Sequence, residues 1–170
     1  DAETSTRKAI ELNPNFADSH SNLGLIFRDK RQLKDAETST RKAIELNPNF
    51  VQAHYNLGGI LKDLGNLKDA EISYRKAIEL NPNFAQAYYN LGNILKDLGN
   101  LKDAEISYRK AIQIKSDFVN AYSNLGNILK DLGNLKDAET STRKAIELNP
   151  NFAEAHYNLG GILKNLGNLK

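Results

Sequence analysis

The stretch that decides the fold is Val51–Phe84, which reads VQAHYNLGGILKDLGNLKDAEISYRKAIELNPNF. The rest of the chain consists of near-copies of this unit, each displaced by 34 residues. The triplet Asn-Leu-Gly begins at Asn22, Asn56, Asn90, Asn124 and Asn158, and a phenylalanine closes each unit at Phe16, Phe50, Phe84, Phe118 and Phe152. Five such periods account for all 170 residues. A fixed period of this length indicates a stacked repeat architecture.

The first half of the unit predicts an amphipathic helix. Ala53, Leu57, Ile60 and Leu61 recur at spacings of three and four residues, which places them on one apolar stripe. Gly65 follows, and glycine readily takes the positive φ that ends a helix. We call this helix and its copies the first-type helices.

The second half predicts another helix, the second-type helix, with Tyr74 on its inner stripe. Asn66 is expected to cap its start through the side chain. Its end is expected just before Pro82, because proline disfavours helical backbone at the residue that precedes it. Asn83 is expected to cap the next first-type helix, with Gln86 at the spacing of a capping box. Each period is therefore predicted to be a helical hairpin.

Small residues predict where the helices of a hairpin cross. Helices of about 13 residues are marginal alone in water, so stacking must supply their stability. Gly58 and Ala70 remove side-chain bulk at the expected crossing. Glycine inside a helix costs up to about 1 kcal/mol relative to alanine. Its recurrence in the other units therefore predicts close backbone approach at Gly24, Gly92, Gly126 and Gly160.

The composition excludes several classes of function. Forty per cent of the residues are apolar, 26% are charged, and the formal net charge is +2, with basic and acidic residues interspersed. Such a balance gives no one-signed patch for nucleic acid or a membrane surface. The absence of cysteine excludes disulfides and cysteine metal sites. No apolar run approaches the roughly 18 residues of a membrane helix. We expect a soluble chain of unknown compartment, with the cytoplasm favoured.

The repeated unit resembles the tetratricopeptide repeat (TPR). The residues that carry the resemblance in one unit are Leu57, Gly58, Leu61, Gly65, Ala70, Tyr74, Ala77 and Pro82. The resemblance implies an all-α fold, an α-solenoid of stacked antiparallel helix hairpins in a right-handed superhelix, with the first-type helices on the concave face. It spans residues 1–170 as a single TPR array. A second-type half-repeat (1–16) precedes complete repeats 17–50, 51–84, 85–118 and 119–152, and a first-type half-repeat (153–170) follows.

Two turns depart from the pattern. Arg31 stands where the other units have the glycine that ends the first-type helix. A non-glycine residue at positive φ costs roughly 1–2 kcal/mol, so we expect that turn to be rearranged or weaker. Ser116 replaces the proline after a second-type helix, and we expect a looser turn there.

No arrangement of residues predicts catalysis. His20, His54 and His156 occupy equivalent positions on the predicted buried side of the first-type helix. We favour packed aromatic substitutes over a metal site, because no carboxylate or second histidine lies at ligand spacing. Asp69 and Glu71 and their copies are interpreted as solvated acids near a helix start. No phosphate-binding glycine loop or nucleophile elbow is present. We therefore predict no enzyme, no catalytic residue, no metal and no cofactor.

The candidate binding residues are polar side chains on the first-type helices. By the resemblance, asparagines at these positions line the groove of TPR arrays that hold peptides, and an amide can pair with any peptide backbone. The alternative is that the asparagines bridge neighbouring repeats structurally. We call this set the asparagine face: Asn22, Asn56, Asn90, Asn124, Asn158, Tyr55, Tyr89, Tyr157, Gln52, Gln86, Asn93, Asn127, Lys62, Lys96 and Lys130.

Three hypotheses about function stay open. The leading one is a protein–protein interaction scaffold that binds an extended peptide or a partner helix on the asparagine face. The second is end-to-end homo-association through the unpaired terminal helices, since neighbouring units are nearly identical. The third is an excised, substrate-recruiting arm of a larger enzyme, such as a glycosyltransferase. The expected partners are proteins or peptides, with no nucleic acid and no membrane.

Overall fold

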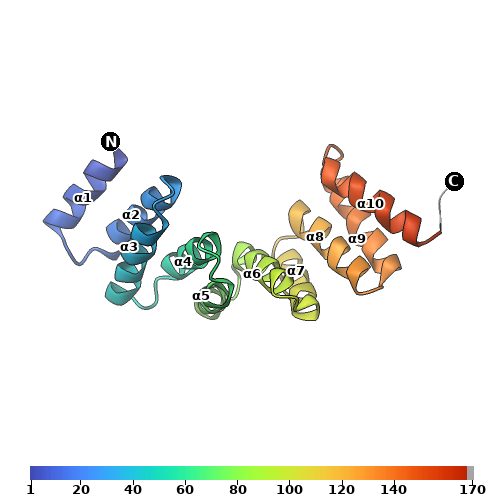
Figure 1. Cartoon of the computed structure of the whole chain (residues 1–170), viewed down its shortest axis with the longest axis horizontal. Coiled ribbons are helices and arrows are strands. Elements are labelled where there is room, and N and C mark those ends of the chain that lie inside the picture. The colour runs from blue at the N-terminus through green and yellow to red at the C-terminus, as the bar shows by residue number, and fades with distance from the viewer. Residues whose placement is uncertain (168–170) are drawn as a thin grey trace. The chain divides into compact units, whose positions relative to one another are not determined.

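The computed structural model describes residues 1–167 and, over that range, consists of ten helices joined by short turns (Figure 1). These are α1 (Ala2–Leu12), α2 (Ala17–Asp29), α3 (Leu33–Leu46), α4 (Val51–Asp63), α5 (Leu67–Leu80), α6 (Ala85–Asp97), α7 (Leu101–Ile114), α8 (Val119–Asp131), α9 (Leu135–Leu148) and α10 (Ala153–Asn165). The predicted all-α repeat fold is confirmed. None of the helices in the described range has both the length and the apolarity needed to cross a membrane.

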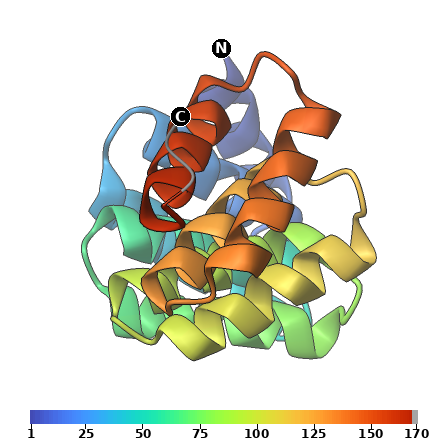
Figure 2. The same ribbon diagram turned by 90° about the vertical axis from the view of Figure 1, so that its right-hand side faces the viewer.

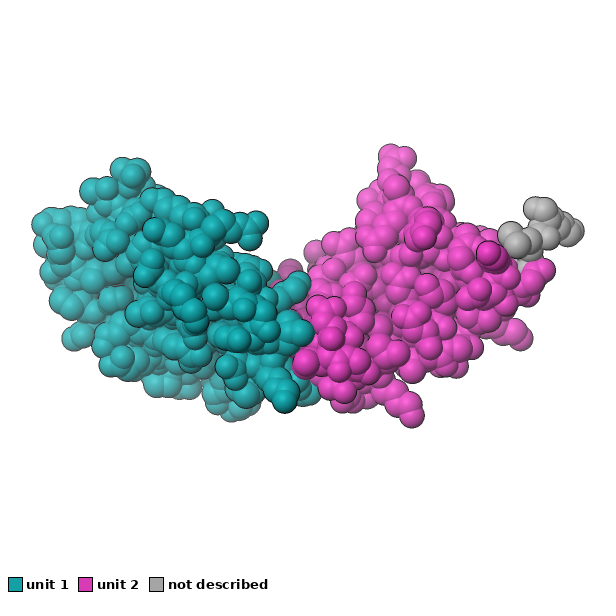
Figure 3. Space-filling model, in the orientation of Figure 1, with its two compact units in different colours: residues 1–82 teal, residues 83–170 magenta. Residues whose placement is uncertain are grey.

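The chain divides into two compact units, residues 1–82 and residues 83–170 (Figure 3). In the first unit, α2 pairs with α3 and α4 with α5, while α1 packs on α2 and α3 packs on α4. In the second unit, α6 pairs with α7 and α8 with α9, while α7 packs on α8 and α9 on α10. The paired helices run antiparallel (Figure 1, Figure 2). Each unit is therefore a stack of helical hairpins, as the repeated sequence predicts.

The turn inside each hairpin is set by a residue at positive φ. Gly65 has φ of 81°, and its N–H donates to the carbonyl of Lys62 at 2.9 Å. The N–H of Asn66 donates to the carbonyl of Leu61 at 2.8 Å. This pair of hydrogen bonds is the Schellman motif, which satisfies carbonyls at the end of a helix. Gly99 and Gly133 adopt the same φ.

Arg31 keeps this turn, so the expected rearrangement is wrong. Its φ is 61°, in the left-handed region. Its N–H donates to the carbonyl of Arg28 at 2.9 Å, and the N–H of Gln32 donates to the carbonyl of Phe27 at 2.9 Å. The hydrogen bonds and packing of the flanking helices therefore outweigh the local preference of arginine. Backbone strain is retained at this one non-glycine residue.

The helix caps differ from the predicted ones. Asn66 occupies the N-cap position of α5, but its side chain makes no capping hydrogen bond. Asn83 does not cap α6, because the N-cap residue of that helix is Phe84. In the equivalent inter-hairpin turns, it is the asparagine before the proline whose side chain makes a local hydrogen bond to the backbone. The side-chain oxygen of Asn47 accepts from the N–H of Asn49 at 3.1 Å.

The turn that contains Ser116 has the same backbone pairing as its copies. The N–H of Phe118 donates to the carbonyl of Lys115 at 3.2 Å, compared with 3.1 Å from Phe50 to Asn47. The ammonium of Lys115 lies 5.4 Å from the centre of the Phe118 ring. Whether this turn is looser stays a prediction.

In four of the five units the partner helix lies close to the recurring glycine, and a backbone atom is among the nearest neighbours in two of them, at Gly24 and Gly126. A Cβ atom on Gly58 would lie 2.8 Å from the Tyr74 ring, and one on Gly92 would lie 2.6 Å from the Tyr108 ring. At the equivalent glycines of the other two hairpins, Gly24 and Gly126, the facing side chains are Thr40 and Thr142. At Gly160, a Cβ atom would meet nothing within 4 Å among the described residues.

Candidate functional site

The asparagine face lies along one side of each first-type helix. In α4, Gln52, Tyr55 and Asn56 share this side, while His54 and Leu57 lie on the opposite one, as the helical period requires. Exposure varies along the face. Its exposed members are Asn22, Gln52, Lys62, Gln86, Lys96 and Tyr157; its half-buried members are Tyr55, Tyr89, Asn90, Asn93, Asn124, Asn127 and Lys130; its buried members are Asn56 and Asn158.

The two buried asparagines join neighbouring first-type helices. Asn56 in α4 donates from Nδ2 to the hydroxyl of Ser21 in α2 at 3.2 Å. Asn158 in α10 makes the same bond to Ser123 in α8 at 3.3 Å. Gln52 donates to Oδ1 of Asn56 at 2.8 Å. These bonds bridge neighbouring repeats, which is the alternative to peptide binding that the sequence left open. Contact of these asparagines with a peptide stays a prediction.

A larger hydrogen-bond network centres on Asn93 in the second unit. The Tyr108 hydroxyl donates to Oδ1 of Asn93 at 2.8 Å. Nδ2 of Asn124 donates to the same oxygen at 2.9 Å and to the Tyr89 hydroxyl at 3.3 Å. Burial raises the pKa of Tyr108, the neighbouring Tyr89 raises it further, and the nearby amide of Asn124 lowers it only in part. Tyr108 is therefore a protonated donor at neutral pH.

In this network the Asn93 amide has a definite orientation. Oδ1 accepts both hydrogen bonds, so it faces Tyr108 and Asn124, and the Nδ2 group is turned away from them. Asn93 is half-buried, so part of this residue is exposed on the asparagine face. The spacing of the repeats identifies Asn93 as a candidate. The sequence feature that could have indicated its hydrogen bond is Tyr108, the tyrosine fifteen residues later in the chain.

The copy of this position in α8 lacks the network. Oδ1 of Asn127 is buried without a hydrogen-bond partner among the described residues. Thr142 stands where the preceding repeat has Tyr108, and its hydroxyl donates to the carbonyl of Ala138 at 2.8 Å. Asn158, the copy of Asn124, donates to Ser123 instead. Asn93 and Asn127 are thus equivalent in sequence but differ in hydrogen bonding.

Arg28 is a residue of the asparagine face that the sequence pattern missed. It stands in α2 where α4 has Lys62, and its Nε donates to Asp63 at 2.7 Å. Burial lowers the pKa of Arg28, but the hydrogen bond and charge of Asp63 outweigh it, so the net shift is upward. The guanidinium lies over Gly59, where a Cβ atom would come within 2.8 Å of it. The sequence feature that could have indicated this contact is Gly59, which stands where α6 has Asn93 and leaves room for the guanidinium.

The histidines are less buried than predicted, because they lie at the edge of the inter-hairpin turn. His20 and His54 are half-buried and His156 is exposed. Nε2 of His54 lies 2.8 Å from the carbonyl oxygen of Pro48, and the other two make the equivalent contact at 2.9 Å. Among residues 1–167, no three His, Cys, Asp or Glu side chains are grouped so that they could hold a metal ion.

Models of known protein families match most of the chain. Two tetratricopeptide repeat models match residues 17–50 and 119–152, and residues 40–72 and 142–170. A third model, described as TPR repeat, matches residues 58–99 and 92–133. A search of curated protein sequences gives no match.

Solved structures with a similar fold include those of YrrB, MamA and PilF. YrrB, described as a TPR protein with an unusual peptide-binding site, is 25% identical with a TM-score of 0.87, over 99% of this chain and 87% of that one. MamA is 28% identical with a TM-score of 0.82, over 89% of each chain. PilF of Pseudomonas aeruginosa is 23% identical with a TM-score of 0.80, over 89% and 69% of the two chains, and supports the fold alone.

Proposed function

Because the chain belongs to the tetratricopeptide repeat family and is a protein–protein interaction scaffold, we propose that its asparagine face holds an extended peptide segment of a partner. The likeness to YrrB, described by its peptide-binding site, supports this proposal. TPR proteins are typically non-catalytic scaffolds, and we propose no catalysis by these residues. Recruitment of substrate to an attached enzyme would use the same face.

The observation that carries the proposal is the oriented amide of Asn93. An extended peptide presents a backbone carbonyl at every residue, and a side-chain amide donor pairs with such a carbonyl whatever the peptide sequence. Tyr108 and Asn124 hold the Asn93 oxygen, so Nδ2 needs no reorientation on binding. A donor that is oriented beforehand loses less entropy when the peptide binds.

The surroundings of this amide suit an uncharged or mixed peptide. Tyr157 on α10 is 83% exposed and offers a large amphipathic surface at the same side of the second unit. The ammonium of Lys96 lies 4.0 Å from the carboxylate of Asp97, and Lys130 lies 3.9 Å from Asp131. Each lysine thus has an acidic side chain beside it, so this part of the face presents both signs of charge. The face is not built as a clamp for a terminal carboxylate.

The variant Asn93→Asp tests the proposal. Aspartate keeps the acceptor that Tyr108 and Asn124 need but has no hydrogen to donate to a peptide carbonyl. Peptides are first selected against the wild-type chain from a random twelve-residue library, and their affinities are then measured by isothermal titration calorimetry. We expect Asn93→Asp to weaken binding roughly tenfold or more, as for a lost hydrogen bond that leaves two acceptors facing each other.

Asn134→Asp is the matched control, because Asn134 is exposed, makes no side-chain cap for α9, and undergoes the same change of charge. Its affinity should stay within about twofold of wild type, since it lies outside the asparagine face. Equal affinities for all three proteins, with unchanged circular dichroism, would contradict the proposal. Failure to select any peptide would contradict it as well.

End-to-end association of this 170-residue chain is a second candidate. The observation that favours it is at Gly160, where an added Cβ atom would meet no described residue within 4 Å, whereas one at the equivalent Gly126 would meet Thr142. Helix α1 repeats the residues that α9 places in such a site, with Thr6 as the copy of Thr142. Sedimentation velocity over a wide range of concentration tests this candidate: a mass that grows with concentration supports it, and a constant monomer mass contradicts it.

A further inference from the structure

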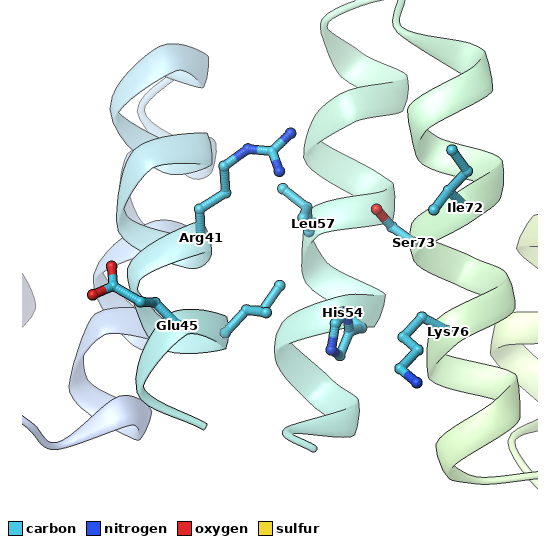
Figure 4. A pocket seen from close by; sticks show the side chains of 8 residues that line it. Arg41, Glu45, His54, Leu57, Ile72, Ser73 and Lys76 are labelled. Carbon is cyan, nitrogen blue, oxygen red and sulfur yellow. The ribbon is translucent and has the colours of Figure 1, made fainter. Parts of the chain in front are cut away.

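A pocket of about 460 Å³ lies in the first unit, between α3 and α5 and above α4 (Figure 4). We call it the α3–α5 pocket. Residues that line it include Arg41, Ile44, His54, Leu57, Ile72 and Lys76. His54 and Leu57 lie on the side of α4 opposite to Gln52 and Asn56, so the pocket is separate from the asparagine face.

The interior of the pocket is aliphatic. Leu57 forms its floor and is buried, and Ile44 on one wall is half-buried. Ile72 on the other wall is 66% exposed, so most of this large apolar side chain is in contact with water. Covering these three side chains removes apolar surface from water and is favourable.

Two polar groups that line the pocket are already engaged. The Ser73 hydroxyl donates to the carbonyl of Asp69 at 2.9 Å, and Nε2 of His54 contacts the carbonyl of Pro48 at 2.8 Å. Because these atoms are held by the backbone and the rest of the interior is aliphatic, the interior favours an apolar group over a polar one.

The rim of the pocket favours a negative charge beside that group. The Arg41 guanidinium reaches over the pocket toward Leu57, whereas the Glu45 carboxylate points away from it (Figure 4), toward Lys42 at 2.7 Å. Lys76 stands on the opposite wall. Arg41 and Lys76 pair with Glu37 and Glu79 on their own helices. Such exposed pairs are weak, so both cations remain able to contact an anion.

The combination of isoleucine and histidine distinguishes this repeat from its copies. The position of Ile72 is threonine at Thr38 and Thr140, and in the repeat where it is isoleucine again, at Ile106, the larger Tyr88 stands in the place of His54. The chain itself therefore supplies substitutions that remove the wall or fill the space without changing the fold.

We infer that the α3–α5 pocket is a second docking site, for an amphipathic helix of a partner protein that inserts one leucine-like side chain and places a carboxylate against Arg41. A helix fits the trough between two helices of the stack. A free amphiphile would keep much of its chain in water in so open a site, whereas the rest of a partner helix covers the rim. The inference does not rest on peptide binding by the asparagine face.

The test uses an eighteen-residue, alanine-rich helical peptide with one leucine and with glutamates three and four residues after it. Binding to the full chain is followed by NMR of methyl-labelled protein. We expect saturable shifts at Ile44, Leu57 and Ile72. Replacing the leucine of the peptide by alanine should weaken binding about tenfold, because the variant peptide no longer buries a leucine side chain in the pocket. Replacing its glutamates by lysines should weaken it severalfold.

Variants of the chain localise the effect. Ile72→Thr and His54→Tyr should each weaken binding at least severalfold, because the first removes the wall and the second fills the pocket. Ile106→Thr is the matched control, since Ile106 is an equally exposed isoleucine, at 65%, on α7, and it should change nothing. Asn93→Asp should also leave the affinity for the helical peptide unchanged, which separates this inference from the proposed function.

Three results would overturn the inference: no saturable shift with the peptide, equal affinity for the glutamate and lysine peptides, or unchanged binding in Ile72→Thr. Octanoate, added in place of the peptide, tests whether the pocket binds a free amphiphile. If octanoate shifts the three methyl groups at concentrations at which the peptide does not, the site takes a small ligand and the docking assignment is wrong.

Discussion

Arg31 holds a backbone conformation that glycine holds in the other hairpin turns of the described chain. The two hydrogen bonds of the turn are intact, so the conformational penalty is borne by one residue. The replacement Arg31→Gly removes that penalty but adds freedom to the unfolded chain. We expect a net gain of about 0.5–1 kcal/mol in the free energy of unfolding, measured by urea denaturation.

The reverse change at the equivalent site provides the control. Gly65→Arg should lower the urea midpoint by a comparable amount, because Gly65 has φ of 81° and no side chain. A lower midpoint in Arg31→Gly would show that the arginine side chain contributes more than the strain removes.

Tyr108 should make stability depend on alkaline pH. Its pKa in the folded chain is raised above the ordinary value of 10.0, chiefly by burial. Above pH 10 the unfolded tyrosine loses its proton while the folded one keeps it, so the unfolded state gains stability as the pH rises. We expect the free energy of unfolding to fall by roughly 1 kcal/mol between pH 10 and pH 11 from this group alone.

The variant Tyr108→Phe isolates this contribution. It cannot ionise, and the other tyrosines are the same in both proteins. The difference in unfolding free energy between wild type and variant should therefore shrink as the pH rises from 9 to 11, in parallel urea titrations. Two curves that stay parallel over this range would contradict the assignment.

At the scale of elements, the crossing of two helices depends on whether a second-type helix faces the glycine. A Cβ atom on Gly126 would overlap the Thr142 hydroxyl, which is fully buried and bonded to Ala138. Gly126→Ala should therefore destabilise the chain by about 1–3 kcal/mol through overpacking. Gly160→Ala meets no atom of residues 1–167 within 4 Å and should stabilise α10 by up to about 1 kcal/mol. Thermal unfolding of both variants measures this contrast, and shifts of the same sign would refute it.

Helix boundaries were predictable because the stop residues recur at a fixed place in each period. Gly65 and Pro82 end helices for local reasons that no tertiary contact needs to supply. The caps were less predictable. An asparagine side chain has several backbone partners within reach, and the choice made by Asn47 depends on the geometry of the turn that follows.

The positions of the candidate site were predictable, but the hydrogen bonds between them were not. Helical spacing places Asn56, Asn93 and Asn124 on one side of their helices. The partners of these residues stand 35, 15 and 31 positions away, at Ser21, Tyr108 and Asn93. Single substitutions at such partners change the network, as Thr142 does for Asn127. Near-identical repeats therefore differ in the hydrogen bonding of equivalent side chains.

At the scale of the whole molecule, the chain offers two surfaces of different character. The asparagine face is polar and rich in amides, whereas the α3–α5 pocket is aliphatic with basic residues at its rim. They lie on opposite sides of the first-type helix α4. A scaffold with two such surfaces can hold two partners at once, and the experiments above test the surfaces independently.

The central claim is that the Asn93 amide donates to the backbone of a bound peptide. The most direct measurement is the ¹⁵N–¹H spectrum of the asparagine side chains while a selected peptide is added. We predict that one Nδ2 proton of Asn93 shifts downfield and saturates with the binding curve, as expected for a new hydrogen bond to a carbonyl. The Asn134 side chain should stay unchanged. Saturable binding that leaves the Asn93 side-chain signals in place would contradict the account.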